Sequence, residues 1–164
     1  MENIHIIAGE VDMIAGGVWS RPGFLIRRLH QIHYTMFYEE TKGDSITPLQ
    51  YGVLTTLAAE PWLDQTTIGN ELGLDRATTA GVLNRLEGKG WIKRRVNQSD
   101  KRSRQAMITK RGMTVITKLQ VCIAVSQHRL MQPLSIKEQK DFMGLLRKLV
   151  QANNQYGRTM LKAF

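Results

Sequence analysis

The stretch LDQTTIGNELGLDRATTAGVLNRLEGKGWIKR, residues 63–94, contains two short helical patterns separated by a tight turn. Asp64 precedes the first pattern and Asp75 precedes the second, each at the N-cap position, where a carboxylate accepts hydrogen bonds from the first turn. Gly73 ends the first pattern and leaves only Leu74 before the next cap. Two helices at this spacing are typical of a helix-turn-helix motif.

The second helix of this motif, predicted over residues 76–88, has two different faces. One face of its helical wheel is apolar and consists of Thr79, Val82, Leu83 and Leu86. The opposite face is small and weakly polar and consists of Ala77, Gly81, Asn84 and Gly88, flanked by Thr78 and Arg85. A merely solvated face usually carries Glu and Lys, so this composition indicates that another body approaches the backbone closely. Either the major groove of DNA or a second helix fits this requirement.

Two short extended runs, residues 91–96 and 105–108, follow the motif and predict a hairpin. Its tip carries Lys101, Arg102 and Arg104, and a charged hairpin tip of this kind is able to enter a minor groove, where arginine is favoured. Asp100 stands among these cations. It either orients an arginine side chain or forms the turn by accepting backbone hydrogen bonds, and both roles are compatible.

Helical patterns flank the motif and the hairpin on both sides. The predicted helices span residues 22–42, 48–59, 110–130 and 136–160. Capping boxes open two of them, with Thr47 and Gln50 before the second and Ser135 and Glu138 before the last. The apolar positions expected on one side of the last helix are Phe142, Leu145, Leu146, Leu149, Tyr156 and Met160.

The positive charge is concentrated in one segment of the chain. The 164 residues carry a net charge of +9, and the segment from Arg85 to Arg111 holds ten Lys and Arg against two acids. Such a segment indicates a polyanion-binding surface, because neutralising phosphates releases their condensed counterions. A solvated face or an acidic membrane surface are the alternatives, and nucleic acid is favoured because the segment is not an amphipathic basic helix.

The single cysteine, Cys122, excludes an internal disulfide framework and fits a reducing compartment. No basic leader precedes a long hydrophobic stretch, and no run is long enough to span a membrane. We therefore expect a cytoplasmic protein without a membrane partner, and a single globular core is the default for 164 residues.

The quoted residues 63–94, followed by SDKRSR at 99–104 and TKRG at 109–112, closely resemble the MarR family of bacterial transcriptional regulators. This resemblance implies a mainly α fold, a winged helix-turn-helix with N- and C-terminal dimerisation helices, assembled as a homodimer. The implied division of the chain is an N-terminal arm at 1–20, dimerisation helices at 21–46 and 109–164, and a DNA-binding winged helix-turn-helix domain at 47–108. The wing motif of the family falls on Asp100 and Arg102.

The resemblance implies a repressor that binds each half of a palindromic operator in double-stranded DNA. With the chemistry of the helix face and hairpin tip, it gives the expected DNA contacts Arg76, Ala77, Thr78, Thr79, Gly81, Asn84, Arg85, Lys101, Arg102 and Arg104.

The segment RPGFLIRRLHQIHY, residues 21–34, resembles the branch of the family that controls the breakdown of nicotinate and related aromatic acids. This implies release from DNA by a small aromatic carboxylate or phenolic effector. The candidate partners for its carboxylate are Arg21, Arg28, His30 and His33, and the candidates to sandwich its ring are Phe24, Tyr34, Phe37 and Tyr51. Any of these side chains fits equally well as an ordinary core aromatic or surface cation.

Other functions fit the sequence less well. Cys122 lies among apolar residues of a helix and is predicted to be a buried, inert thiol rather than a redox sensor. His30 and His33 are too few to specify a metal site, so neither a metal nor another cofactor is expected. The chain shows no phosphate-binding glycine loop, nucleophile elbow or metalloprotease motif and is not expected to be an enzyme. A non-specific architectural or RNA-binding protein remains the alternative.

Overall fold

The computed structural model describes residues 16–42 and 44–161, so most of the predicted N-terminal arm lies outside the described residues. Its elements in chain order are η1 (Val18–Ser20), α2 (Pro22–Thr41), α3 (Pro48–Ala59), β1 (Leu63–Asp64), α4 (Gln65–Leu72), α5 (Arg76–Gly88), β2 (Ile92–Val96), β3 (Arg104–Ile108), α6 (Lys110–Met131), α7 (Ile136–Ala152) and η2 (Asn154–Tyr156). The predicted fold class, a mainly helical winged helix-turn-helix, is confirmed.

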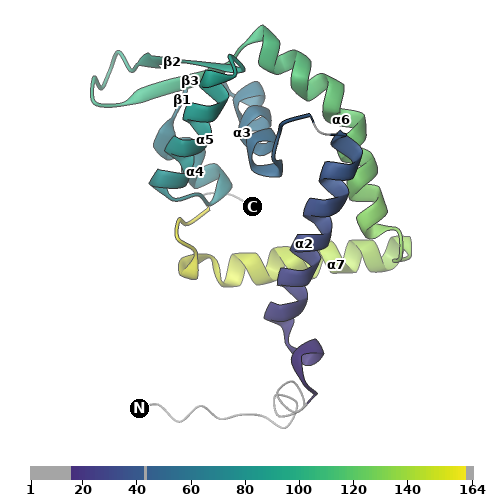
Figure 1. Ribbon diagram of the computed structural model, residues 1–164. Helices are drawn as coiled ribbons and strands as arrows, with labels where there is room; N and C mark the ends of the chain where they lie inside the picture. Colours follow the sequence, from purple (N-terminus) through teal and green to yellow (C-terminus); the bar gives the residue numbers. More distant parts are fainter. Residues whose placement is uncertain (1–15, 43, 162–164) are drawn as a thin grey trace, which may run out of the picture.

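Figure 1 shows a compact part, made of short helices and a small sheet, beside a set of longer helices. The helices α3, α4 and α5 cluster beside a small antiparallel sheet with strand order β1-β3-β2, and the β2–β3 hairpin projects outward as the wing. The long helices α2 and α6 pack against each other beside this cluster, and α7 crosses below it. The wing and α7 therefore lie on opposite sides of this cluster.

Local caps set the boundaries of most helices, as predicted. Thr47 Oγ1 accepts from Gln50 N at 3.1 Å while the Gln50 side chain accepts from Thr47 N at 3.2 Å, which completes the capping box of α3. Ser135 and Glu138 form the same box at α7. These contacts span three residues, so the sequence alone specifies them.

One hydrophobic core joins the winged helix to the long helices. Its largest fully buried apolar side chains are Phe37, Ile46, Val53, Leu54, Leu57, Ile68, Leu83, Leu86 and Leu119. Phe37 comes from α2 and Leu119 from α6, so the core runs across the predicted boundaries between the dimerisation helices and the DNA-binding domain. The first turn of α6 also packs closely against the winged helix, because a Cβ on Gly112 would clash with the Trp91 carbonyl oxygen.

The structure differs from the sequence-based expectation at the last helix and in the sheet. The prediction that this helix continues to Met160 is wrong, since α7 ends at Ala152, where Asn153 Nδ2 donates to the Leu149 carbonyl at 2.8 Å and satisfies a terminal acceptor. Strand β1 was not predicted, because two residues are too few to show an alternating pattern. It pairs with β3, Leu63 opposite Ala106.

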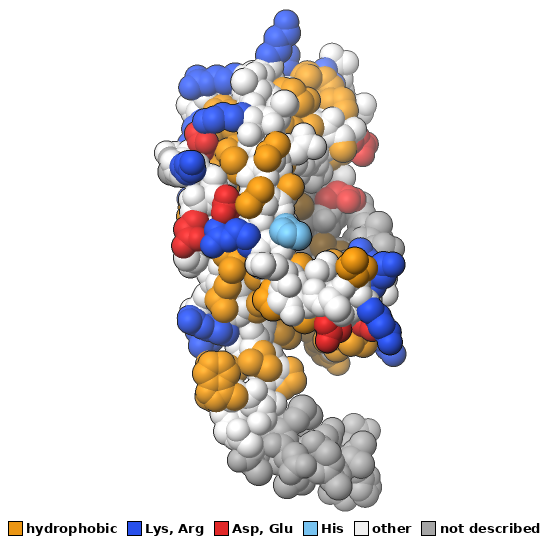
Figure 2. Space-filling view, turned by 90° about the vertical axis from the view of Figure 1, so that its right-hand side faces the viewer, with side chains coloured by type: hydrophobic (Ala, Val, Ile, Leu, Met, Phe, Trp, Pro, Cys, Tyr) orange, Lys and Arg blue, Asp and Glu red, His pale blue; other side chains and the backbone are white. Residues whose placement is uncertain are grey.

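Much apolar surface of the long helices remains uncovered within one chain. No residue of α7, all of which lies in the described part of the chain, is buried. The exposed large apolar side chains of α6 and α7 are Met113, Val121, Val125, Ile136, Met143, Leu145, Leu149 and Val150. Figure 2 shows hydrophobic side chains between charged groups along one side of the molecule. In the described residues, no helix combines the length and hydropathy needed to cross a bilayer.

Candidate nucleic-acid interface and effector pocket

The boundaries of α4 and α5 are set by a glycine and two aspartate caps. Asp64 Oδ1 accepts from Thr66 N at 2.8 Å and from Thr67 N at 2.9 Å at the start of α4. Gly73 ends α4 with a φ of 64°, a left-handed conformation that glycine adopts without steric cost. Asp75 Oδ1 then accepts from Thr78 N at 2.8 Å and starts α5. The helix-turn-helix is present as predicted.

Helix α5 buries its apolar face and exposes its small face. Thr79, Val82, Leu83 and Leu86 are all at most 3% exposed. The exposed residues of the predicted DNA contacts on this helix are Arg76, Ala77, Asn84 and Arg85, while Thr78 and Gly81 are half-buried. The small residues thus lie where a groove is able to approach the backbone.

Thr79 corrects the predicted set of DNA contacts. Its side chain is completely buried, and its hydroxyl donates to the Asp75 carbonyl at 2.8 Å. The expectation that Thr79 contacts DNA is wrong, because the hydroxyl is used inside the fold. Its position on the apolar face of the helical wheel already indicated this orientation.

An arginine that the sequence analysis missed connects the wing to α5. Arg94 on β2 donates from Nε to Glu87 Oε2 at 2.8 Å, forms an ion pair with the same carboxylate through Nη2, and donates from Nη2 to Asn84 Oδ1 at 2.7 Å. Its side chain is only 14% exposed. Because Asn84 Oδ1 already accepts from Arg94, its NH₂ group is the part presented for donation to base acceptors. The available signal was strand alternation, which puts Arg94 on the same face as the buried Ile92.

The wing tip combines a tight turn with outward cations. Asp100 Oδ1 accepts from the Arg102 backbone N at 3.0 Å and from Arg102 Nε at 3.3 Å, so it forms the turn and orients the arginine. The Arg102 side chain is 94% exposed, and Lys101 and Arg104 are also exposed. A hollow of about 410 Å³ between the wing tip and the start of α4 is lined in part by Arg76, Arg102 and Arg104. The three cations share one concave surface.

Three more cations of the basic segment make contacts within the chain. Arg85 Nε donates to the Gly81 carbonyl at 3.1 Å, so its side chain lies back along α5. Arg95 stacks 3.7 Å from the ring centre of Trp62, and Lys93 lies 5.4 Å from the same ring. Because Lys93 and Arg95 lie at Trp62 rather than on α5 or at the wing tip, the net charge of the segment overstates the charge of the surface formed by α5 and the wing tip.

The predicted effector residues of α2 fall on two opposite faces. Successive helical residues are about 100° apart, which places Arg21, Phe24 and Arg28 opposite His30, His33, Tyr34 and Phe37. Phe37 is 2% exposed and belongs to the core, and Tyr51 on α3 packs against that core. One chain therefore does not bring the eight predicted residues around a single ligand.

The histidine face of α2 makes ring contacts and one side-chain hydrogen bond within the chain. His30 and Tyr34 have ring centres 4.6 Å apart, and His33 Nε2 lies 3.0 Å from Gln127 Nε2. Burial, and then the nearby His30, hold the pKa of His33 below its ordinary value. At neutral pH His33 thus offers a hydrogen bond rather than a positive charge to a carboxylate.

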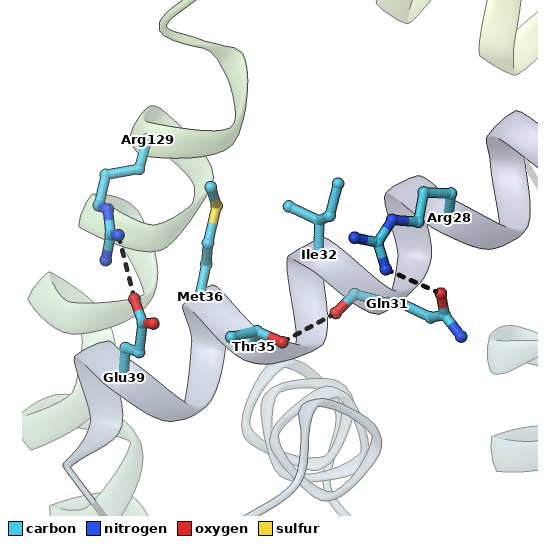
Figure 3. A pocket seen from close by; sticks show the side chains of 7 residues that line it. All are labelled: Arg28, Gln31, Ile32, Thr35, Met36, Glu39 and Arg129. Atoms are coloured by element: carbon cyan, nitrogen blue, oxygen red, sulfur yellow. Dashed lines mark hydrogen bonds and ion pairs between the residues drawn. The ribbon is translucent and has the colours of Figure 1, made fainter.

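The other face of α2 borders a hollow of about 280 Å³, which is lined by Arg28 and Ile32 from α2 and by Arg129 from α6 (Figure 3). Arg129 is paired with Glu39 at 3.0 Å and with Glu40 at 2.5 Å. By contrast, Arg28 donates only weakly, to Gln31 Oε1 at 3.5 Å. Of the predicted effector residues, Arg28 is the one that lines this hollow, and Arg129 was missed because its partners are about ninety residues away in the chain.

Cys122 is half-buried, so the prediction of a buried thiol is wrong in degree. It lies on α6 between the exposed Val121 and the half-buried Ile123. Within residues 16–42 and 44–161, no three His, Cys, Asp or Glu side chains gather in a way that would hold a metal ion.

Comparison with known proteins identifies the family. The MarR family model matches residues 46–103, which include the helix-turn-helix and the wing as far as the turn before β3. The PcaV transcriptional regulator from Streptomyces coelicolor, solved in complex with its natural ligand, is 37% identical, with a TM-score of 0.77 over 82% of this chain and 95% of its own. The chain belongs to the MarR family.

Two further similarities extend over most of this MarR-family chain. The transcriptional repressor CouR, solved bound to a 23-mer DNA duplex, is 26% identical, with a TM-score of 0.76 over 82% of this chain and 96% of its own. A putative transcriptional regulatory protein for the hcr operon of Thauera aromatica is 26% identical over 88% of this chain and 87% of its own. The likeness therefore includes the long helices as well as the winged helix.

The ion pair between Arg94 and Glu87 should stabilise the fold in a pH-dependent way. Hydrogen bonding from Arg94 holds the pKa of Glu87 below its ordinary value. Its contribution is thus complete above the unfolded-state pKa of about 4.3 and is lost as the pH falls through the lower folded-state pKa. Glu87→Gln should lower the free energy of unfolding by about 1 kcal/mol near neutral pH, a value reduced for the partial exposure of Glu87.

Urea denaturation of the wild type and of Glu87→Gln, at neutral pH and at about pH 3, measures this difference. Glu71→Gln, at an exposed acid on α4, is the matched control and should have little effect. A difference of the same size at both pH values would contradict the ion pair.

Proposed function

We propose that this MarR-family protein is a homodimeric repressor that binds a palindromic operator through α5 and the wing and is released by a small aromatic acid. The observation that carries the proposal is the joint exposure of the small face of α5 and the cationic wing tip on one side of the winged helix. The Arg94 contact with Asn84 and Glu87 supports it further, because it fixes the wing relative to α5.

The proposed roles of the DNA contacts differ. Ala77, Thr78, Gly81, Asn84 and Arg85 line the groove-facing side of α5, where small residues permit close approach and the polar ones read base edges. Arg76 and the tip residues Lys101, Arg102 and Arg104 contact phosphates or the minor groove. The DNA complex recorded for CouR supports this arrangement, since its fold is similar.

Arg102→Ala should weaken binding to DNA without unfolding the protein, because the side chain is 94% exposed and contacts only the turn. The probe is a palindromic duplex selected from a random library on the wild-type protein. We expect a loss of affinity of about tenfold and a salt dependence reduced by about one counterion, measured by fluorescence anisotropy at several salt concentrations.

Arg147→Ala, which removes the same charge from an exposed position on α7, should leave affinity for the selected duplex unchanged. An equal loss of affinity in Arg102→Ala and Arg147→Ala would mean that only the net charge of the protein determines binding to the duplex. Equal wild-type affinity for the selected duplex and for random duplex would favour the architectural alternative.

The proposal of a homodimer rests on α7. Leu145, Leu149 and Val150 are 61%, 52% and 41% exposed, and they belong to the apolar side of an amphipathic helix. Apolar surface of this kind is costly in water unless another surface covers it. A second copy fits, because two copies would also present two α5 helices to the two halves of a palindrome.

Leu149→Glu should convert the dimer to a monomer, because an interface would have to bury an unpaired carboxylate. Sedimentation equilibrium measures the association constant, and Lys140→Glu, on the opposite, polar side of the same helix, should remain dimeric. A dimeric Leu149→Glu variant, or a monomeric wild type, would show that α7 is not the interface.

The proposed effector site is the hollow in Figure 3. Arg28 would pair with the carboxylate and Ile32 and Met36 would contact the ring, whereas the charge of Arg129 is already offset by Glu39 and Glu40. The PcaV regulator, solved in complex with its natural ligand, is similar over most of the chain, and this similarity supports a ligand-responsive protein.

Benzoate, hydroxybenzoates and nicotinate should be added in turn to the complex with the selected duplex, with release followed by anisotropy. Arg28→Ala should raise the concentration needed for release about tenfold, because a charge-assisted hydrogen bond is lost. Arg27→Ala removes the neighbouring exposed cation and should leave the concentration needed for release unchanged. Release by none of these acids would contradict the effector class, and an unchanged Arg28→Ala variant would favour the His30 face.

A further inference from the structure

The end of the chain returns to the turn of the helix-turn-helix motif. After α7 ends at Ala152, the backbone reverses through η2 and runs back toward α4, as Figure 1 shows in yellow. Residues 153–161, called the C-terminal strap below, end beside Gly73. Neither the operator contacts nor the proposed effector site involves this segment.

The strap contacts three consecutive residues of the turn. Thr159 Oγ1 donates to the Leu74 carbonyl at 2.9 Å, and Arg158 Nη1 lies 3.4 Å from Asp75 Oδ2. Leu161 packs on Gly73, where an added Cβ would lie 3.2 Å from Leu161 Cδ2. The contacts combine a hydrogen bond, an ion pair and apolar packing over the whole turn.

The strap is also held in shape by its own side chains. Asn154 Nδ2 donates to the Leu161 carbonyl at 2.9 Å, and Asn154 Oδ1 accepts from Leu161 N at 2.9 Å. The side-chain amide of Asn154 thus bonds to both the carbonyl and the N–H of Leu161, as a paired backbone residue would. These two bonds close a loop of eight residues. Asn154 follows the last turn of α7, so the strap is fixed to that helix rather than trailing from it.

The residues that the strap contacts determine where α5 begins. Leu74 N donates to the Gly69 carbonyl at 2.8 Å while its own carbonyl accepts from Thr159, so both of its backbone groups are bonded. Asp75 caps α5 through Oδ1 and meets Arg158 through Oδ2. A shift of this turn would therefore move the first turn of α5, which carries Arg76, Ala77 and Thr78.

We propose that the C-terminal strap positions α5 for DNA reading, with Thr159 and Leu161 as positioning residues that do not touch DNA. This inference rests on the proposed DNA-binding function. Arg158 contributes less, because its side chain is 85% exposed and its ion pair is screened by solvent. Since the strap continues from α7, it links the helix of the proposed dimer interface to the start of α5.

The first test does not involve DNA. Thr159→Val removes the hydroxyl while keeping the shape, and amide hydrogen exchange of the free protein is then followed at Thr78 and Thr79. Both amides bond to Asp75 at the start of α5. We expect exchange at these amides to become at least about threefold faster, because the turn opens more often. Thr159→Ser, which keeps the hydroxyl, should restore wild-type exchange.

Thr114→Val is the matched control, because the Thr114 hydroxyl donates to the Lys110 carbonyl within its own helix α6. It should leave exchange at the start of α5 unchanged. Unchanged exchange in Thr159→Val, or an equal increase in the control, would overturn the role of the strap. This result is obtained whether or not the protein binds DNA, so it is separate from a failure of the proposed function.

The second test uses the selected palindromic duplex. Thr159→Val should weaken binding about threefold to tenfold, and the slope of affinity against salt should stay at the wild-type value, because no phosphate contact is removed. Arg158→Ala should also keep the wild-type slope. A slope reduced by about one in Arg158→Ala would overturn the inference for that residue by showing a direct phosphate contact.

Discussion

The burial of one face of α5 is the constraint on which the proposed interface depends. Val82, Leu83 and Leu86 are at most 3% exposed, and together they bury enough apolar area to fix the rotation of the helix about its axis. Fixing the rotation decides which residues face outward. The small residues Ala77 and Gly81 stabilise nothing in the core. Their position opposite the buried face is what gives another molecule access to the backbone of the helix.

The basic segment of the sequence separates into structural and surface charges once the chain folds. Arg94 pairs with Glu87 and bonds to Asn84, and Arg95 stacks on Trp62, so both charges are used within the fold. By contrast, Asp100 holds Arg102 in an outward position. A half-buried pair such as Arg94 with Glu87 gains from weaker solvent screening, and it connects β2 to α5. The exposed Arg102 contributes little to stability, so it is available for phosphate.

The long helices and the winged helix are connected by two sets of contacts. The core includes Phe37 of α2 and Leu119 of α6, so the long helices and the winged helix are packed as one body. The C-terminal strap adds a second connection, from the end of α7 to the turn before α5. A ligand or a second subunit that moves the long helices would therefore act on α5 through packed side chains as well as through the strap.

By itself, the sequence determined the helices, their caps and the presence of the wing, because those features depend on contacts a few residues apart. Asp75 caps α5 through an amide three residues on, and Gly73 needs only its own backbone freedom to end α4. The tertiary structure alone decided that Arg94 meets Asn84 and that Thr159 reaches Leu74. Such contacts depend on strand register and on how distant segments pack, and local periodicity carries no information about either.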